Sequence, residues 1–94
     1  LLPEISVDEG AVKHIINGAS VMRPGVIKIG DEVRKDGVVK VTNEGHILCI
    51  GISFYDKEEI EKLDKGVVAK NVHRKGDKFW EAVSDYLASL KQKG

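Results

Sequence analysis

The chain has 94 residues, of which 41% are hydrophobic and 32% charged, a composition that fits one globular domain and excludes a disordered segment. Fifteen basic residues balance fifteen acidic ones. A protein that coats a polyanion would carry a large positive excess, so any nucleic-acid surface must be a local one. The apolar runs are all shorter than the roughly 18 residues that a membrane span needs.

The single cysteine, Cys49, lies within the apolar run HILCIGISF, where it is expected to be a small buried hydrophobe. One cysteine cannot form an intramolecular disulfide, which favours a reducing, cytoplasmic location. Because the chain begins with Leu1 and not with methionine, we expect a further N-terminal domain to precede it.

The first predicted elements are a strand from Pro3 to Val7 and a helix that follows it. Either Ser6 or Asp8 can serve as the N-cap, and Ser6 stands three residues before a glutamate, as in a capping box. The apolar stripe of the helix consists of Ala11, Val12, Ile15 and Ile16. Gly18 ends the helix at a position where a left-handed residue is usual.

Strands are predicted next, over Val26 to Ile29 and Glu32 to Arg34. Lys35-Asp36-Gly37 has the sequence of a tight hairpin turn. It leads into a strand from Val38 to Thr42, which we expect to pair with a long strand from His46 to Phe54.

That long strand has apolar residues on both faces, which is typical of a central strand, and Gly51 predicts a bend or bulge within it. Asp56 is expected to cap a second helix that stops at Gly66, and Val67 to Arg74 reads as the last long strand. Beyond it, spacings of 3, 4 and 3 residues predict a C-terminal helix with the stripe Trp80, Val83, Leu87 and Leu90.

These elements predict a mixed α+β fold, mostly β: a barrel of five or six strands with two short helices and a C-terminal helix. We expect residues 1–80 to form the domain and residues 81–94 a helical extension.

The loop GASVMRPG, Gly18 to Gly25, is the first candidate binding element. Its glycines let another backbone approach closely, and Arg23 carries a planar fork of donors suited to phosphate. It is not a nucleotide-binding P-loop, because it follows the C-terminal end of a helix and phosphate loops precede the N-terminal end. An ordinary helix-to-strand turn is the alternative.

The second candidate is basic: Lys65 to Lys78 holds five basic residues against one acidic residue. Strand geometry places Lys70, Val72 and Arg74 on one face and the intervening residues on the other, so only part of the cluster can face one partner. A solvated strand with nothing bound is the alternative.

Catalytic and metal-binding patterns are absent from the sequence. His14, His46 and His73 fall on different elements without ligand spacing, and we predict no cofactor. No nucleophile-base pair is recognisable. Phe79 and Trp80 are expected to plug the core and not to stack on bases, since aromatic residues are few.

Three segments resemble the PUA domain, the RNA-binding module named after pseudouridine synthases and archaeosine transglycosylases. They are VDEGAVKHIINGASVMRPGV, HILCIGIS and DKGVVAKNVHRKGDKFW, in the family's order and spacing. Within that superfamily the stretch IEKLDKG is most similar to the malignant T-cell amplified sequence group and stand-alone PUA proteins. This resemblance implies a pseudobarrel that binds structured RNA through backbone and shape, near tRNA and the small ribosomal subunit. The translation-linked members of this group also pair with a density-regulated protein partner.

The resemblance further implies an RNA face formed by the helix-to-strand loop and the last strand. Its candidate residues are Lys13, Asn17, Gly18, Ala19, Arg23, Pro24, Gly25, Val72, His73, Arg74 and Lys75. We therefore expect a non-enzymatic module that binds tRNA or rRNA, and no DNA or membrane. Two alternatives stay open: the RNA-handling domain of an RNA-modifying enzyme, and a protein-docking module that uses the C-terminal helix.

Overall fold

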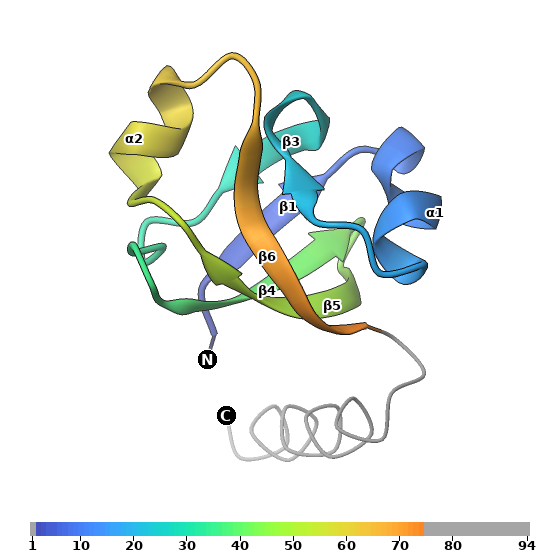
Figure 1. Ribbon diagram of the computed structural model, residues 1–94. Helices are drawn as coiled ribbons and strands as arrows, with labels where there is room; N and C mark the ends of the chain where they lie inside the picture. The colour runs from blue at the N-terminus through green and yellow to red at the C-terminus, as the bar shows by residue number, and fades with distance from the viewer. Residues whose placement is uncertain (1, 75–94) are drawn as a thin grey trace.

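The structure is a computed structural model that describes residues 2–74 (Figure 1). In this part of the chain the elements are β1 (Glu4–Val7), α1 (Glu9–Ile16), β2 (Val21–Met22), the short 3-10 helix η1 (Arg23–Gly25), β3 (Val26–Ile29), β4 (Val38–Asn43), β5 (His46–Ser53), α2 (Lys57–Lys62) and β6 (Val67–Arg74). The predicted C-terminal helix and the plug residues Phe79 and Trp80 lie outside the described residues.

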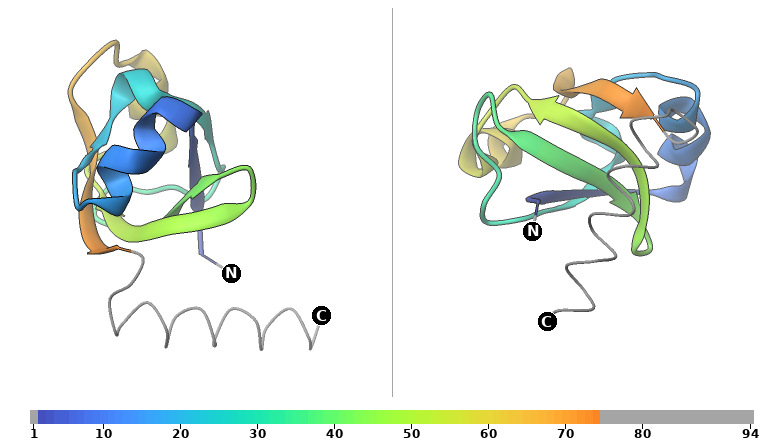
Figure 2. Two further views of the ribbon diagram at one scale, coloured as in Figure 1. Left: turned by 90° about the vertical axis from the view of Figure 1, so that its right-hand side faces the viewer. Right: turned by 90° about the horizontal axis from the view of Figure 1, so that it is seen from below.

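The strands form one sheet in the order β2-β6-β5-β4-β1-β3, whose two edge strands are joined by η1 alone. A flat sheet of six strands would hold its edges about 24 Å apart. The chain from Met22 to Val26 can span only about 14 Å. The sheet must therefore curl until its edges nearly meet, as Figure 2 shows, and the predicted pseudobarrel is confirmed.

The predicted strand Glu32–Arg34 and its hairpin are wrong, because β1 lies between β3 and β4 and pairs in parallel with β4. Asp36 does have a positive φ of 64°, so the turn itself forms. It serves another purpose: Asp36 N–H donates to Ser53 O at 2.7 Å, and Ser53 N–H donates to Gly37 O at 2.9 Å. The turn thus starts β4 beside the end of β5. Val33 is buried and anchors the preceding loop in the core.

The hairpin of β4 and β5 is confirmed and turns through Glu44 and Gly45, whose φ values of 49° and 83° belong to a tight two-residue turn. β5 lies between β4 and β6, which confirms the predicted central strand. The predicted irregularity at Gly51 is confirmed too. The register with β6 shifts between Ile50 and Gly51, and a Cβ at Gly51 would stand 2.4 Å from the carbonyl oxygen of Lys70.

The start of α2 shows the predicted capping arrangement. Asp56 N–H donates to the Glu59 carboxylate at 3.1 Å, and an oxygen of Asp56 accepts from Lys35 N–H at 2.8 Å. Lys57 forms an ion pair with Asp31, and its hydrogen bond and charge lower the pKa of the Asp31 carboxyl. These contacts fix the loop between β3 and β4 against α2.

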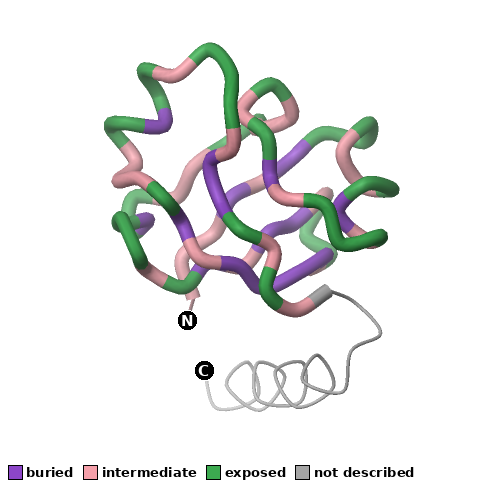
Figure 3. The backbone as a smooth tube through the Cα atoms, in the orientation of Figure 1, coloured by how far each residue is buried: buried purple, intermediate pink, exposed green. Residues whose placement is uncertain are grey.

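The core fills the inside of the barrel, and each helix contributes one buried isoleucine to it, Ile15 from α1 and Ile60 from α2 (Figure 3). The strands add Ile5, Val7, Val21, Val39, Val41, Leu48, Cys49, Val68 and Ala69. Within residues 2–74, neither helix has the length or the apolar character to cross a membrane.

The Cys49 thiol is fully buried, as predicted, and desolvation raises its pKa to about 12. A thiol with so high a pKa stays protonated at neutral pH, and only the thiolate is a nucleophile. We expect no reaction of the folded protein with Ellman's reagent at pH 8 and one equivalent of reaction in guanidinium. Rapid reaction of the folded protein would contradict this burial.

Candidate nucleic-acid interface

The start of α1 is tied to η1 by Asp8, which is the N-cap. Its carboxylate accepts from Ala11 N–H at 3.0 Å, and its own N–H donates to Gly25 O at 2.8 Å. The alternative cap, Ser6, instead places its hydroxyl 3.3 Å from the Glu4 carboxylate. Gly25 passes so close to α1 that an added Cβ would lie 3.2 Å from the Cβ of Ala11. A glycine is therefore favoured at this crossing.

The end of α1 is tied to β6 by Asn71. Its side-chain amide donates to Ile15 O at 2.9 Å and to Ala19 O at 3.0 Å. Between these acceptors Gly18 has a φ of 100°, as predicted for the residue that ends the helix. β2 also pairs with β6. The two candidate elements, far apart in the sequence, thus lie side by side.

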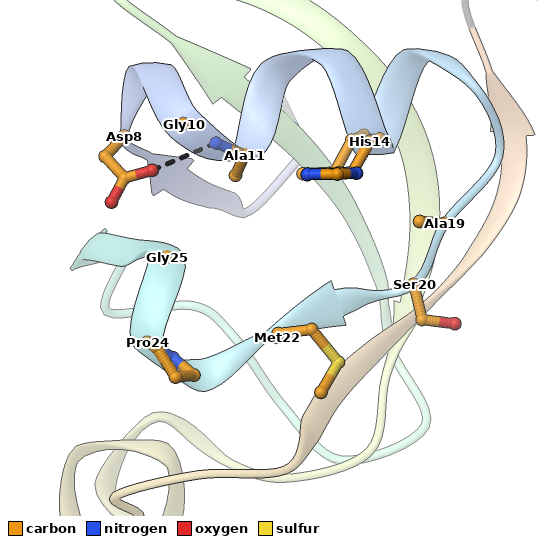
Figure 4. Close-up of a pocket in the computed structure, with 10 residues that line it drawn as sticks. Asp8, Gly10, Ala11, His14, Ala19, Ser20, Met22, Pro24 and Gly25 are labelled. Atoms are coloured by element: carbon orange, nitrogen blue, oxygen red, sulfur yellow. Dashed lines mark hydrogen bonds between the residues drawn. The ribbon is translucent and has the colours of Figure 1, made fainter.

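Between α1 and the β2–η1 segment lies a groove of about 530 Å³ (Figure 4). It is lined by Asp8, Gly10, Ala11, His14, Ile15, Ala19, Ser20, Met22, Pro24 and Gly25. In the view of Figure 4, Asp8 and Pro24 stand at one end and Ser20 at the other, while His14 on α1 and Met22 on β2 lie on opposite sides of the middle. An apolar floor with a few polar groups suits a flat organic ring or a sugar face.

The predicted site residues fall into three groups. Ala19, Pro24 and Gly25 line the groove. Lys13, Asn17 and Gly18 are exposed on the last turn of α1 and just after it, while Val72, His73 and Arg74 end β6. Lys75 lies outside the described residues.

Arg23 lies apart from the basic end of β6. Its N–H donates to Gly66 O at 2.8 Å, which places it beside the start of β6, whereas Arg74 is the last residue of that strand. The strand between them spans roughly 25 Å. The guanidinium Nε donates to Ile60 O at 2.8 Å, and Nη1 lies 3.5 Å from Val26 O. The backbones of the two arginines therefore lie at opposite ends of β6, and the Arg23 side chain has a structural partner in Ile60 O.

Sequence reasoning missed several lining residues, above all His14 and Met22. Gly10, Ala11 and His14 share one face of α1 at helical spacing, which was an available signal. Met22 gave little signal, because it was assigned to a loop. The structure places it in β2, 48% exposed. Within residues 2–74 no three His, Cys, Asp or Glu side chains gather in a way that could hold a metal ion.

The sheet order, the near-closed barrel and the groove beside α1 define a small β-barrel binding domain. The sequence model of the PUA domain matches residues 3–75, so this chain belongs to the PUA domain family, and the resemblance is confirmed.

Relatives with the same domain are found in archaea and eukaryotes. The chain is 41% identical over 78 residues to the protein MJ1432 of Methanocaldococcus jannaschii, covering 81% of this chain and 48% of that one. It is 39% identical over 85 residues to human malignant T-cell-amplified sequence 2, covering 85% and 47%. With translation machinery-associated protein 20 of Schizosaccharomyces pombe it shares 35% over 86 residues, covering 85% and 48%. The chain thus spans about half the length of these relatives.

Several solved structures have a fold similar to that of this chain. The protein PH0734.1 of Pyrococcus horikoshii is 37% identical, with a TM-score of 0.76 over 84% of this chain and 48% of that one. The PUA domain protein APE0525 of Aeropyrum pernix has a TM-score of 0.78 at 29% identity, covering 89% and 49%. A chain of an archaeal H/ACA complex of Nop10 and Cbf5 reaches 0.75 at 22% identity, over 78% and 24%, which shows the fold alone.

Proposed function

We propose that this domain is a non-catalytic module that binds structured RNA, a tRNA or rRNA stem or 3′ end, by backbone and shape. The observation that carries the proposal is the junction made by Asn71, which brings the glycine loop after α1 against the end of β6 beside an open groove. The name of the Schizosaccharomyces pombe relative, translation machinery-associated protein 20, supports a role in translation and hence in the cytoplasm.

The parts of this face have different tasks. Lys13 on the last turn of α1 contacts one phosphate and the end of β6 another, while the exposed residues Gly18 and Ala19 approach the sugars. The wide, shallow minor groove of A-form RNA presents its 2′-hydroxyls to such a surface. The apolar groove behind the loop accepts a sugar or an unpaired base between His14 and Met22. Because few phosphates are neutralised, the affinity is modest and only moderately salt-dependent.

Arg23 has a separate role in this arrangement. Its Nε donates to Ile60 O, so only its Nη atoms remain for a phosphate, at the opposite end of β6 from Arg74. The two arginines then mark opposite ends of a bound stem.

Two other functions compete with this proposal. The relatives are about twice as long as this chain, so the domain could serve as the RNA-handling part of a larger RNA-modifying enzyme. A protein-docking module, including one that pairs with a density-regulated protein, is the second. Both alternatives are compatible with the same fold. The RNA-handling domain of an enzyme would bind RNA in isolation, whereas a protein-docking module would not.

We expect Lys13→Glu to weaken binding of a fluorescein-labelled tRNA about tenfold and to lower the salt slope by about 0.7–0.9, the value for one phosphate contact. Fluorescence anisotropy across salt concentrations measures both. The matched control is Lys28→Glu, an equal charge change at an exposed position of β3, on the other edge of the sheet. Equal losses in the two variants would show a non-specific charge effect, and tRNA binding undiminished in Lys13→Glu would remove α1 from the RNA face.

A further inference from the structure

The outer face of the sheet formed by β4, β5 and β6 carries a patch of aliphatic side chains. Val39 and Val41 point into the core, so their neighbours along β4 point outward. Val38 of β4 is paired with Ile52 of β5. The side chains of residues paired in this way lie on the same face of the sheet. Ile50 lies on the same face, two residues before Ile52.

This patch is unusual for a barrel exterior, where antiparallel strands normally alternate apolar inside and polar outside. Val38 is 44% exposed, whereas Ile50 is only 5% exposed although it points away from the core. Seen from below in Figure 2, the β4–β5 hairpin faces the viewer while α1 and α2 lie toward the two ends. Neither helix of the described part of the chain covers this face.

The chain leaves the described barrel beside the patch. Arg74 is the last residue of β6 and pairs with Cys49, directly before Ile50. The five residues 75–79 can span up to about 17 Å. Crossing from β6 to β4 requires only about 10 Å. The segment that begins at Trp80 can therefore reach any part of the patch.

The segment itself is complementary to the patch in polarity and charge. The stripe Trp80, Val83, Leu87 and Leu90 repeats with helical spacing, and these residues would extend along about 15 Å of helix. Glu81 and Asp85, one turn apart, flank the stripe. The outer face of the sheet offers Lys40 and Lys70 beside the aliphatic patch, since Lys40 pairs with Ile50 and Lys70 with Ile52.

We propose that residues 80–90 pack as an amphipathic helix of the same chain across the outer face of β4, β5 and β6, with the stripe on Val38, Ile50 and Ile52. The helix then covers an apolar face of the barrel and is a part of the domain. It lies on the opposite surface of the sheet from the core, beside the end of β6, where His73 pairs with Ile50.

Trp80 is the only tryptophan in the chain, so its fluorescence reports on this contact directly. In the full chain we expect a blue-shifted emission and strong protection from iodide quenching, independent of protein concentration. Val38→Lys and Ile52→Lys should each shift the emission to the red and raise the quenching constant several-fold, while the far-ultraviolet circular dichroism of the strands is retained. The matched control is Ile27→Lys, on β3 and 68% exposed, which should leave the emission unchanged.

Three results would overturn the proposal. One is an emission of the folded wild type that matches the guanidinium-unfolded chain. A second is protection that appears only as the concentration rises together with a dimer in light scattering, because the occupant would then be a second copy. The third is a Val38→Lys variant whose tryptophan emission is the same as that of the wild type. Val38 is already half exposed, so this substitution does not disturb the core.

Discussion

Replacing Gly51 by alanine is expected to lower the free energy of unfolding by about 3 kcal/mol, with little change in the denaturant slope. The added Cβ would lie 2.4 Å from the carbonyl oxygen of Lys70, an approach that real side chains do not make. The obstructing atom belongs to the backbone of β6, so no rotamer change relieves the clash. The two central strands must separate where the ladder is already irregular.

Gly10→Ala is the matched control, because it adds the same methyl group in α1. There the nearest atom, a carboxylate oxygen of Asp8, stands 3.4 Å away, an ordinary contact. Alanine favours the helix over glycine, so this variant should gain about 0.5–1 kcal/mol. Urea unfolding followed by circular dichroism measures both changes. A loss below about 1 kcal/mol for Gly51→Ala would show that β6 moves aside easily and that its register is loosely held.

The register of β6 also matters for the interface, since Asn71 is the residue opposite Gly51 and holds the loop after α1. A displaced β6 would pull this amide away from Ala19 O. The close packing at Gly51 and the position of the loop after α1 therefore both depend on the position of β6.

Elements with local signals were predictable from the sequence. The capped α2, the two-residue turn of the β4–β5 hairpin and the end of α1 at Gly18 each depend on residues within one turn of one another. Local chemistry decides such features, and the chain shows that chemistry directly. The bulge at Gly51 was predictable for the same reason.

Elements that depend on distant pairing were not predictable in this way. Asp36-Gly37 forms a turn, but β1 enters the sheet between β3 and β4, so the turn does not join two neighbouring strands. The residues 32–34 become a loop anchored by buried Val33. Likewise the pair Val21–Met22 forms a strand because β6 lies alongside, although its own sequence reads as a loop.

Some features of the candidate site were likewise predictable from the sequence and others were not. The glycine loop and the last strand could be selected from composition and spacing, and their proximity is confirmed by the Asn71 hydrogen bonds. The hydrogen-bond acceptor of the Arg23 side chain could not be predicted, because this acceptor, Ile60 O, is thirty-seven positions away in the sequence. The groove between Met22 and α1 likewise depends on where the helix packs.

Replacing Arg23 by alanine is expected to destabilise the fold by about 2 kcal/mol, the range for a hydrogen bond from a charged group. The Nε–H donates to Ile60 O at 2.8 Å and links η1 to α2. Ile60 is fully buried, and its carbonyl would keep only the bond from Leu63 N–H. Urea unfolding measures the loss.

Arg23→Lys separates this structural role from a contact with phosphate. Lysine keeps the positive charge but lacks the Nε fork, so we expect a similar loss of stability with an almost unchanged salt slope for tRNA binding. Arg23→Ala should reduce both the stability and the salt slope of tRNA binding. If both variants are destabilised while both bind tRNA as the wild type does, measured where more than nine-tenths of the protein is folded, Arg23 serves the barrel alone. The RNA face then ends at Pro24, and the charges on α1 and at the end of β6 carry the phosphate contacts.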